Sequence, residues 1–130
     1  MKKPKIKMTV VKEDSGYSAY AKVANEFIGT QADNYNHLKA MILDAVNLSF
    51  EGKGILYTID EIEFKYDLES FFDFYKVINA KALSERIGMN QSLLAQYIKG
   101  IKKPSSSQTK RILQGVQQIG RELSDVSFLL

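Results

Sequence analysis

The chain has 130 residues, 45% apolar and 25% charged, a composition typical of a soluble globular protein with one domain or two small ones. It contains no cysteine, which excludes disulfides and cysteine–metal sites and fits a reducing compartment. No apolar run approaches the roughly 20 residues that span a bilayer, and charged residues from Lys12 onward interrupt the basic start before a signal-peptide core forms. We therefore expect a cytoplasmic protein without membrane contact.

The net charge of +3 is distributed unevenly. Residues 1–66 contain nine Lys or Arg and nine Asp or Glu, so their charges cancel. Residues 79–121 contain eight Lys or Arg and a single acid, Glu85, so this segment carries +7. A cluster of this kind is either a solvated basic face or a phosphate-binding surface.

The first half begins with alternating apolar and polar residues, the period-2 pattern of half-buried strands. We expect three strands, over residues 5–11, 17–21 and 27–30. Glu13 to Gly16 carry the turn chemistry that joins the first two strands into a hairpin.

From Asp33 the apolar period changes to three and four, which predicts an amphipathic helix of about four turns. Its apolar residues are Leu38, Met41, Ile42, Ala45 and Val46. Gly52 and Gly54 end it, and residues 55–66 alternate again as a fourth strand or a bent pair. The expected order is β-β-β-α-β, an α+β domain over residues 1–66 with one helix on a small antiparallel sheet.

Two segments in this half carry a family signature, EDSGYSAYAKV at residues 13–23 and FIGTQAD at residues 27–33. They resemble the HicB antitoxin family, in which a Gly-Tyr-x-Ala-Tyr strand leads to a Gly-x-x-Thr-x-Gly-Asp-like turn before the helix. The chain departs from that pattern at Ala32, which replaces the second glycine, and it lacks the usual proline before the third strand. The resemblance implies a partial ribonuclease-H-like fold without catalysis that binds HicA, a small toxin that degrades messenger RNA.

Residues 67–130 are expected to form an all-α domain. Asp67 is a plausible N-cap, and Leu68, Phe71, Phe72 and Tyr75 give the helix that follows an apolar side. This helix is predicted to open the second domain and to connect it to the sheet.

Residues 79–104 have the spacing of a helix-turn-helix. Gly88 supplies the left-handed conformation of a helix end, and Asn90 is a good N-cap for a second helix. The apolar side of that helix comprises Leu93, Leu94, Tyr97 and Ile98. Short helices joined in this way place the second helix in the major groove of DNA. A plain helical bundle has the same pattern.

The side of the second helix away from its apolar residues carries amide and hydroxyl groups. We expect base contacts from Gln91, Ser92 and Gln96, since an amide side chain can form two hydrogen bonds at once to the major-groove edge of adenine. We expect phosphate contacts from Asn90, Lys81, Lys99, Lys102 and Lys103.

The segment resembles the DNA-binding domain of the Xre and Cro/C1 repressor family over roughly residues 68–124. The matching positions are Leu83, Gly88, Asn90, Gln91, Ser92, Leu94, Gly100 and Pro104. The resemblance implies a lambda-repressor-like fold that binds double-stranded DNA. The chain departs from it at Ile98, where the family often has glutamate.

After Pro104, Ser105 and Gln108 are spaced as a capping box for a long helix, within which Gly115 and Gly120 suggest close helix packing. Its apolar side comprises Ile112, Leu113, Val116, Ile119 and Leu123. The apolar tail, residues 126–130, either folds back or meets a partner subunit.

No catalytic, metal or cofactor site is expected. Residues 60–63 include three acids that are more simply interpreted as a solvated strand edge, and His37 as a surface residue. Four aromatics of the first half suggest either a base-stacking platform for RNA or ordinary packing, and the zero net charge of that half argues for packing. They are Tyr17, Tyr20, Phe27 and Tyr35.

The expected function is that of a DNA-binding transcriptional regulator, a HicB-type antitoxin that neutralises a HicA-like toxin and represses its own operon. Because one small helix-turn-helix reads a half-site, we expect a homodimer or a higher homo-oligomer. The alternative is a protein-interaction or dimerisation module that binds no specific DNA.

Overall fold

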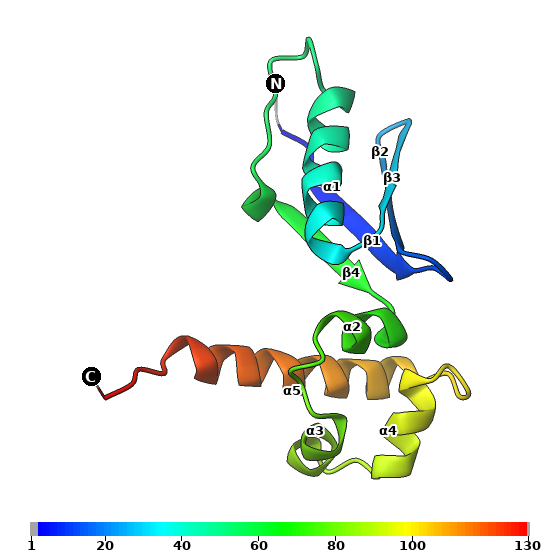
Figure 1. Cartoon of the computed structure of the whole chain (residues 1–130), viewed down its shortest axis with the longest axis vertical. Coiled ribbons are helices and arrows are strands. Elements are labelled where there is room, and N and C mark those ends of the chain that lie inside the picture. Colours follow the sequence, from blue (N-terminus) through cyan, green and yellow to red (C-terminus); the bar gives the residue numbers. More distant parts are fainter. Residues whose placement is uncertain (1–2, 130) are drawn as a thin grey trace. The chain divides into compact units, whose positions relative to one another are not determined.

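The computed structural model describes residues 3–129, and its contacts divide the chain into two compact units, up to Phe74 and from Tyr75 onward. Within the described residues it contains a four-stranded sheet and five α-helices (Figure 1). The expected α+β class is confirmed at this level. No helix in this range combines the length and apolar character needed to cross a bilayer.

The sheet of the first unit is mixed rather than wholly antiparallel. Its strands are β1 (Ile6–Lys12), β2 (Tyr17–Val23), β3 (Glu26–Ala32) and β4 (Ile62–Tyr66), in the order β3-β2-β1-β4. The pairs β1–β2 and β2–β3 are antiparallel, as expected from the hairpin pattern. β4 pairs with β1 in parallel, which corrects the expectation of a purely antiparallel sheet.

The parallel pairing follows from the crossover through helix α1 (Tyr35–Ser49). β3 lies at one edge, and α1 lies along one face of the sheet before the chain reaches β4 at the opposite edge (Figure 1). A connection across the sheet face brings a strand back in the parallel direction. Residues 55–58 form no strand, and a single 3₁₀ turn, η1 (Ile59–Glu61), precedes β4.

The core of the first unit lies between the sheet and α1. Alternation along β1 turns Ile6, Met8 and Val10 toward the helix, where they are almost completely buried. The matching buried residues of α1 are Leu38, Ile42 and Val46. Burial of such side chains contributes about 1.5–3 kcal/mol each.

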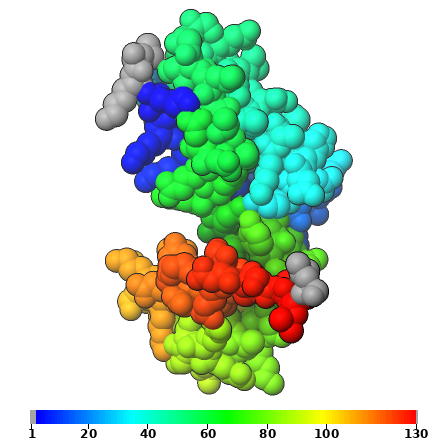
Figure 2. All heavy atoms as spheres, turned by 90° about the vertical axis from the view of Figure 1, so that its left-hand side faces the viewer, coloured from blue at the N-terminus to red at the C-terminus, as the bar shows by residue number. Residues whose placement is uncertain are grey.

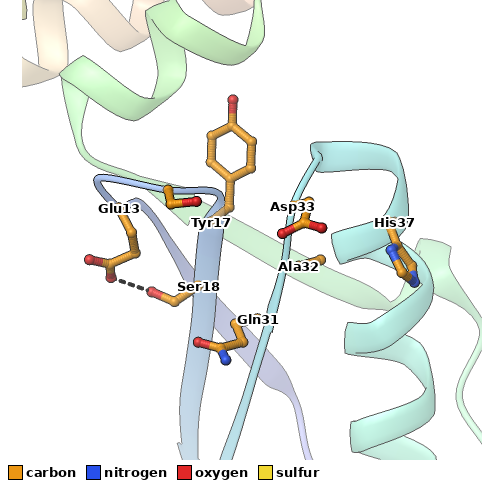
Figure 3. Close-up of a pocket in the computed structure, with 8 residues that line it drawn as sticks. Glu13, Tyr17, Ser18, Gln31, Ala32, Asp33 and His37 are labelled. Atoms are coloured by element: carbon orange, nitrogen blue, oxygen red, sulfur yellow. Dashed lines mark hydrogen bonds between the residues drawn. The ribbon is translucent and has the colours of Figure 1, made fainter.

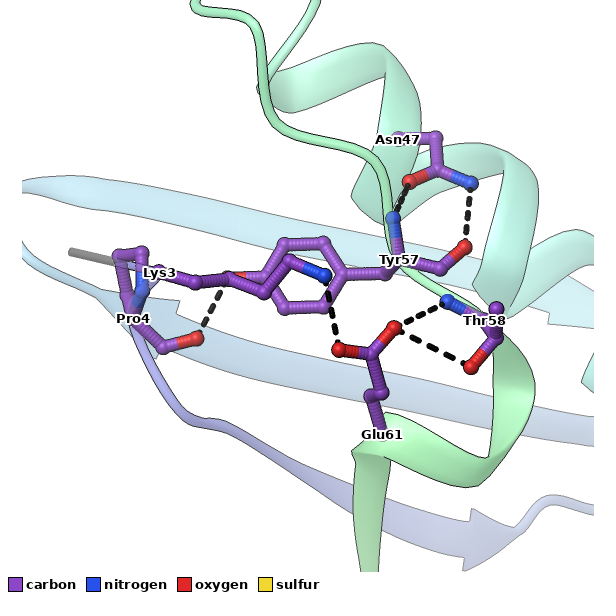
Figure 4. Close-up of polar contacts among 6 residues, drawn as sticks. All are labelled: Lys3, Pro4, Asn47, Tyr57, Thr58 and Glu61. Carbon is purple, nitrogen blue, oxygen red and sulfur yellow. Dashed lines mark hydrogen bonds and ion pairs between the residues drawn. The ribbon is translucent and has the colours of Figure 1, made fainter. Parts of the chain in front are cut away.

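A polar cluster fixes the segment that leads into β4 (Figure 4). The Asn47 carboxamide accepts from the Tyr57 amide at 2.7 Å and donates to its carbonyl at 3.2 Å, and the Tyr57 hydroxyl donates to the Pro4 carbonyl. Glu61 accepts from the Thr58 amide and forms a 2.7 Å ion pair with Lys3. The hydrogen bonds from Lys3 and Thr58 lower the pKa of Glu61 to about 2.

Helix α2 (Leu68–Phe74) belongs to the first unit, although we expected it to open the second domain. The Asp67 side chain accepts from the Ser70 amide at 2.7 Å, so the predicted N-cap is confirmed. The Phe74 ring packs against Tyr17 and Tyr35, with ring centroids 4.6 and 4.3 Å away. These contacts hold α2 on the first unit and move the expected boundary from residue 66 to residue 74.

The second unit contains helices α3 (Ala80–Ile87), α4 (Gln91–Ile98) and α5 (Ser106–Ser124). Leu83, Leu94 and Ile112 are its most deeply buried apolar residues, one from each helix. In Figure 2, α5 runs in orange and red along the surface of this unit.

Candidate nucleic-acid interface

Helix α3 ends at Gly88, as the sequence predicts, and begins after Asn79, a cap that sequence analysis did not predict. The Asn79 side chain accepts from the Ala82 amide at 2.9 Å and caps the first turn. Gly88 has a φ of +66°, and the Met89 amide donates back to the Ser84 carbonyl at 2.9 Å. Glycine adopts this left-handed conformation without strain, so α3 stops and the chain turns.

A turn of three residues, 88–90, separates the end of α3 from the start of α4. The Asn90 side-chain oxygen accepts from the Leu93 amide at 3.1 Å, which confirms the predicted N-cap. Leu94 and Tyr97 are buried, whereas Asn90, Gln91 and Ser92 are exposed. The pair α3–α4 therefore has helix-turn-helix connectivity, with polar side chains free at the start of its second helix.

The three residues expected to contact bases lie along α4. Gln91 and Ser92 are exposed in its first turn, and Gln96 is half-buried one turn beyond Ser92 on the same side. The Gln96 backbone carbonyl accepts from the amides of Ile101 and Lys102 at 3.0 and 3.3 Å. These bonds fold the loop after α4 back against the helix and fix the position of its basic residues.

The residues expected to contact phosphates surround this helix. Lys99 is the C-cap of α4, Lys102 and Lys103 lie in the following loop, and Lys81 lies in the first turn of α3. All four are exposed, and none forms an ion pair with any residue between 3 and 129. The Asn90 oxygen is occupied by capping, which leaves its amide group as the donor for a phosphate.

Two other basic residues of the +7 segment have structural roles that sequence analysis missed. Arg86 forms a bidentate pair with Glu122 at 2.8 Å for both bonds, and this pairing lowers the pKa of the Glu122 carboxyl. Arg111 donates to the carbonyls of Ile87 and Gly88 at 2.7 Å, so α5 holds the C-terminal end of α3.

The aromatic residues considered for base stacking separate into two groups. Tyr17 and Tyr35 pack around Phe74, as ordinary packing predicts. Tyr20 and Phe27 remain exposed on strands β2 and β3, with nearly parallel rings 6.2 Å apart. The alternating pattern of the sequence identified the strands but did not distinguish these environments.

The first unit also has an open hollow of about 560 Å³ beside the β1–β2 turn (Figure 3). Glu13 lies on one side of it, where its carboxylate accepts from Ser18 at 2.7 Å, and exposed His37 lies on the other, on α1. Among the described residues, no group of three or more His, Asp or Glu is placed to hold a metal ion.

Comparisons with protein-family models, curated proteins and solved structures give no match for this chain.

Proposed function

We propose that the protein is a sequence-specific regulator of transcription that binds double-stranded DNA through α3 and α4. The observation that carries this proposal is the exposed pair Gln91 and Ser92 at the capped start of α4. The first turn of the second helix is the part of a helix-turn-helix that reaches base edges in the major groove. The hydrogen bonds at both ends of the turn hold these residues on a rigid support.

In this arrangement the two classes of contact come from different residues. Gln91, Ser92 and Gln96 read the bases by hydrogen bonds, and the Gln91 carboxamide bonds N6 and N7 of adenine together. Lys81, Lys99, Lys102, Lys103 and the Asn90 amide hold phosphates and set the orientation of α4. Because Arg86 and Arg111 are engaged within the unit, the unpaired lysines supply the electrostatic attraction.

The protein acts as a homodimer on a pseudo-palindromic operator, since a single α4 covers only one half-site. The exposed apolar residues of α5 support self-association. Leu113 and Leu123 are 51% and 65% exposed on a helix that buries Ile112 almost completely. Apolar side chains left on one side of a long helix commonly mark an interface.

For the first unit, the resemblance of its Gly16-Tyr17 strand and its helix-leading turn to the HicB family supports an antitoxin role. The unit binds a HicA-like toxin, and the second unit represses the shared operon. Co-expression with the product of the adjacent gene tests this part. Rescue of growth together with co-purification of the two proteins is expected, and toxicity unaffected by this protein would refute it.

The DNA-binding part is tested by selecting bound duplexes from a randomised library with the full chain. The expected result is enrichment of one sequence with two related half-sites about one helical turn, or a multiple of it, apart. Recovery of unenriched sequence after repeated rounds would refute the proposal. That result would favour the second candidate, an interaction module, which the exposed Leu123 and Phe128 side chains also suit.

A further inference from the structure

The face of the sheet opposite α1 carries its own distinct set of side chains. Strand alternation directs Ala19, Ala21 and Ile28 toward the buried side, so their neighbours along the strands point the other way. This open face presents Tyr20, Phe27, Lys5, Lys7, Lys22 and Lys65.

The two aromatic rings form an exposed platform. Tyr20 is 45% exposed and Phe27 is 72% exposed, and their ring planes differ by only 15°. Gly29, opposite Tyr20 in the sheet, makes room for this arrangement, because a Cβ atom there would lie 2.8 Å from Phe27 Cε1. The Phe27 ring therefore covers the Gly29 backbone and remains open to solvent on its other side.

Positive charge collects around this platform, although residues 1–66 have no net charge. Lys22 is paired with Phe27 across the sheet. Tyr20 on β2 and Lys65 on β4 are both paired with Thr9 on β1, which lies between them. Lys5, Lys7, Lys22 and Lys65 form no ion pair within residues 3–129. The acids of this face are Glu63, opposite Lys7, and Glu13 at its far end beside Ser18.

We propose that this open face binds single-stranded nucleic acid, independently of the duplex site on the second unit. Successive bases stack on Phe27 and Tyr20, and Lys7, Lys22 and Lys65 bind the phosphates between them. Aromatic rings beside a basic sheet surface bind unpaired bases of any sequence, and a duplex hides those base faces. Lysines are depleted at protein interfaces, so this surface suits a polyanion better than a protein partner.

The test uses the full chain and fluorescein-labelled 12-mers of uridine and of thymidine, measured by anisotropy with excess random duplex DNA occupying the second unit. Phe27→Leu keeps an apolar side chain over Gly29 but removes the stacking ring, and it should weaken binding about tenfold. Lys7→Gln with Lys22→Gln should weaken binding and reduce its salt dependence. Circular dichroism verifies that both variants fold.

The matched control, Lys76→Gln with Lys110→Gln, removes the same charge from exposed positions of the second unit and should leave single-strand binding unchanged. Tighter binding of oligouridine would assign RNA as the ligand, and equal binding would assign single strands of either kind. Cross-linking of a bromouridine oligomer should label the peptides that contain Tyr20 and Phe27. Absence of binding, or a loss as large in the Lys76 and Lys110 control as in the variants of the sheet face, would overturn the proposal and leave the face as a protein-docking surface.

Discussion

Gln91 is the residue on which sequence recognition depends most in this account, because its carboxamide is exposed in the first turn of α4. The variant Gln91→Ala should lower discrimination between operator and scrambled duplex by about 1–3 kcal/mol, through loss of a bidentate contact to one base. The measurement is the ratio of the two dissociation constants at fixed salt.

Lys103→Ala is the matched control for that experiment. It removes a phosphate contact, so it should weaken binding to both duplexes alike. It should also reduce the slope of the logarithm of the binding constant against the logarithm of the salt concentration by about 1. If Gln91→Ala instead left the ratio of dissociation constants at its wild-type value, Gln91 would have no role in reading bases.

Glu61 links stability to pH through its contacts with Lys3 and Thr58. These contacts lower its folded-state pKa from 4.5 to about 2, so its carboxylate form stabilises the fold. That contribution is complete above the ordinary pKa and is lost as the pH falls from about 4.5 to about 2. Because the side chain is exposed, the effect is small.

The corresponding prediction concerns Glu61→Gln. This variant should be less stable than the wild type at neutral pH, and the two should converge as the pH approaches 2. Denaturant unfolding at a series of pH values measures the difference. Glu63→Gln, an exposed change on β4, should not reproduce the pattern, and a Glu61→Gln difference that stayed constant with pH would contradict the assigned cause.

At the scale of elements, α3 and α5 approach closely at one glycine. A Cβ atom on Gly115 would lie 2.4 Å from Ile87 Cγ2, whereas one on Gly120 would meet nothing within 4 Å. The expectation of close packing is therefore confirmed for Gly115 and wrong for Gly120. The sequence alone could not show which glycine faces α3, because both glycines interrupt the same helix.

This difference predicts opposite effects of the same substitution. Gly120→Ala should stabilise the second unit by about 0.5–1 kcal/mol through helix propensity. Gly115→Ala gains the same propensity but overpacks against Ile87, so it should be less stable than Gly120→Ala by about 1–3 kcal/mol. Hydrogen exchange of the α3 and α4 amides measures the second unit separately. If the α3 and α4 amides were equally protected against exchange in the two variants, α3 and α5 would not pack closely at Gly115.

Local patterns predicted most elements but not their partners. Alternation identified β1, β2 and β3, and the change of period identified α1. The parallel pairing of β4 was missed because alternation carries no information on strand direction. The partner of α2 was missed because an apolar side does not specify what covers it, and here aromatic rings of the first unit do.

Those features of the candidate site that depend on residues close together in the sequence were predictable. The end of α3 at Gly88, the cap Asn90 and the exposure of Gln91 and Ser92 follow from residue type and helical spacing. The roles of Arg86 and Arg111 were not predictable, since one partner is an acid 36 residues away and the other is a pair of backbone carbonyls. Net charge therefore overstated the number of cations free to bind phosphate.

For the molecule as a whole, the proposed operator binding requires self-association, and the exposed apolar side of α5 is the proposed interface. Leu123→Glu places a charge on the exposed apolar side of this helix and should shift the protein toward monomer and weaken operator binding at least tenfold. Sedimentation velocity measures the oligomeric state. Gln114→Glu adds the same charge at an exposed polar position on the opposite side of the helix from Leu123 and should leave the protein dimeric. A Leu123→Glu protein that remained dimeric would remove α5 from the interface.

Sequence-specific DNA binding is tested most directly by fluorescence anisotropy of the full chain on the DNA upstream of its own gene and on a scrambled duplex, each at several salt concentrations. The proposed function requires nanomolar binding to the upstream duplex and at least about a hundredfold preference over the scrambled one. Weak, equal and steeply salt-dependent binding to both duplexes would contradict it. The lysines around α4 would then form a general polyanion surface, and the protein would not be a sequence-specific regulator.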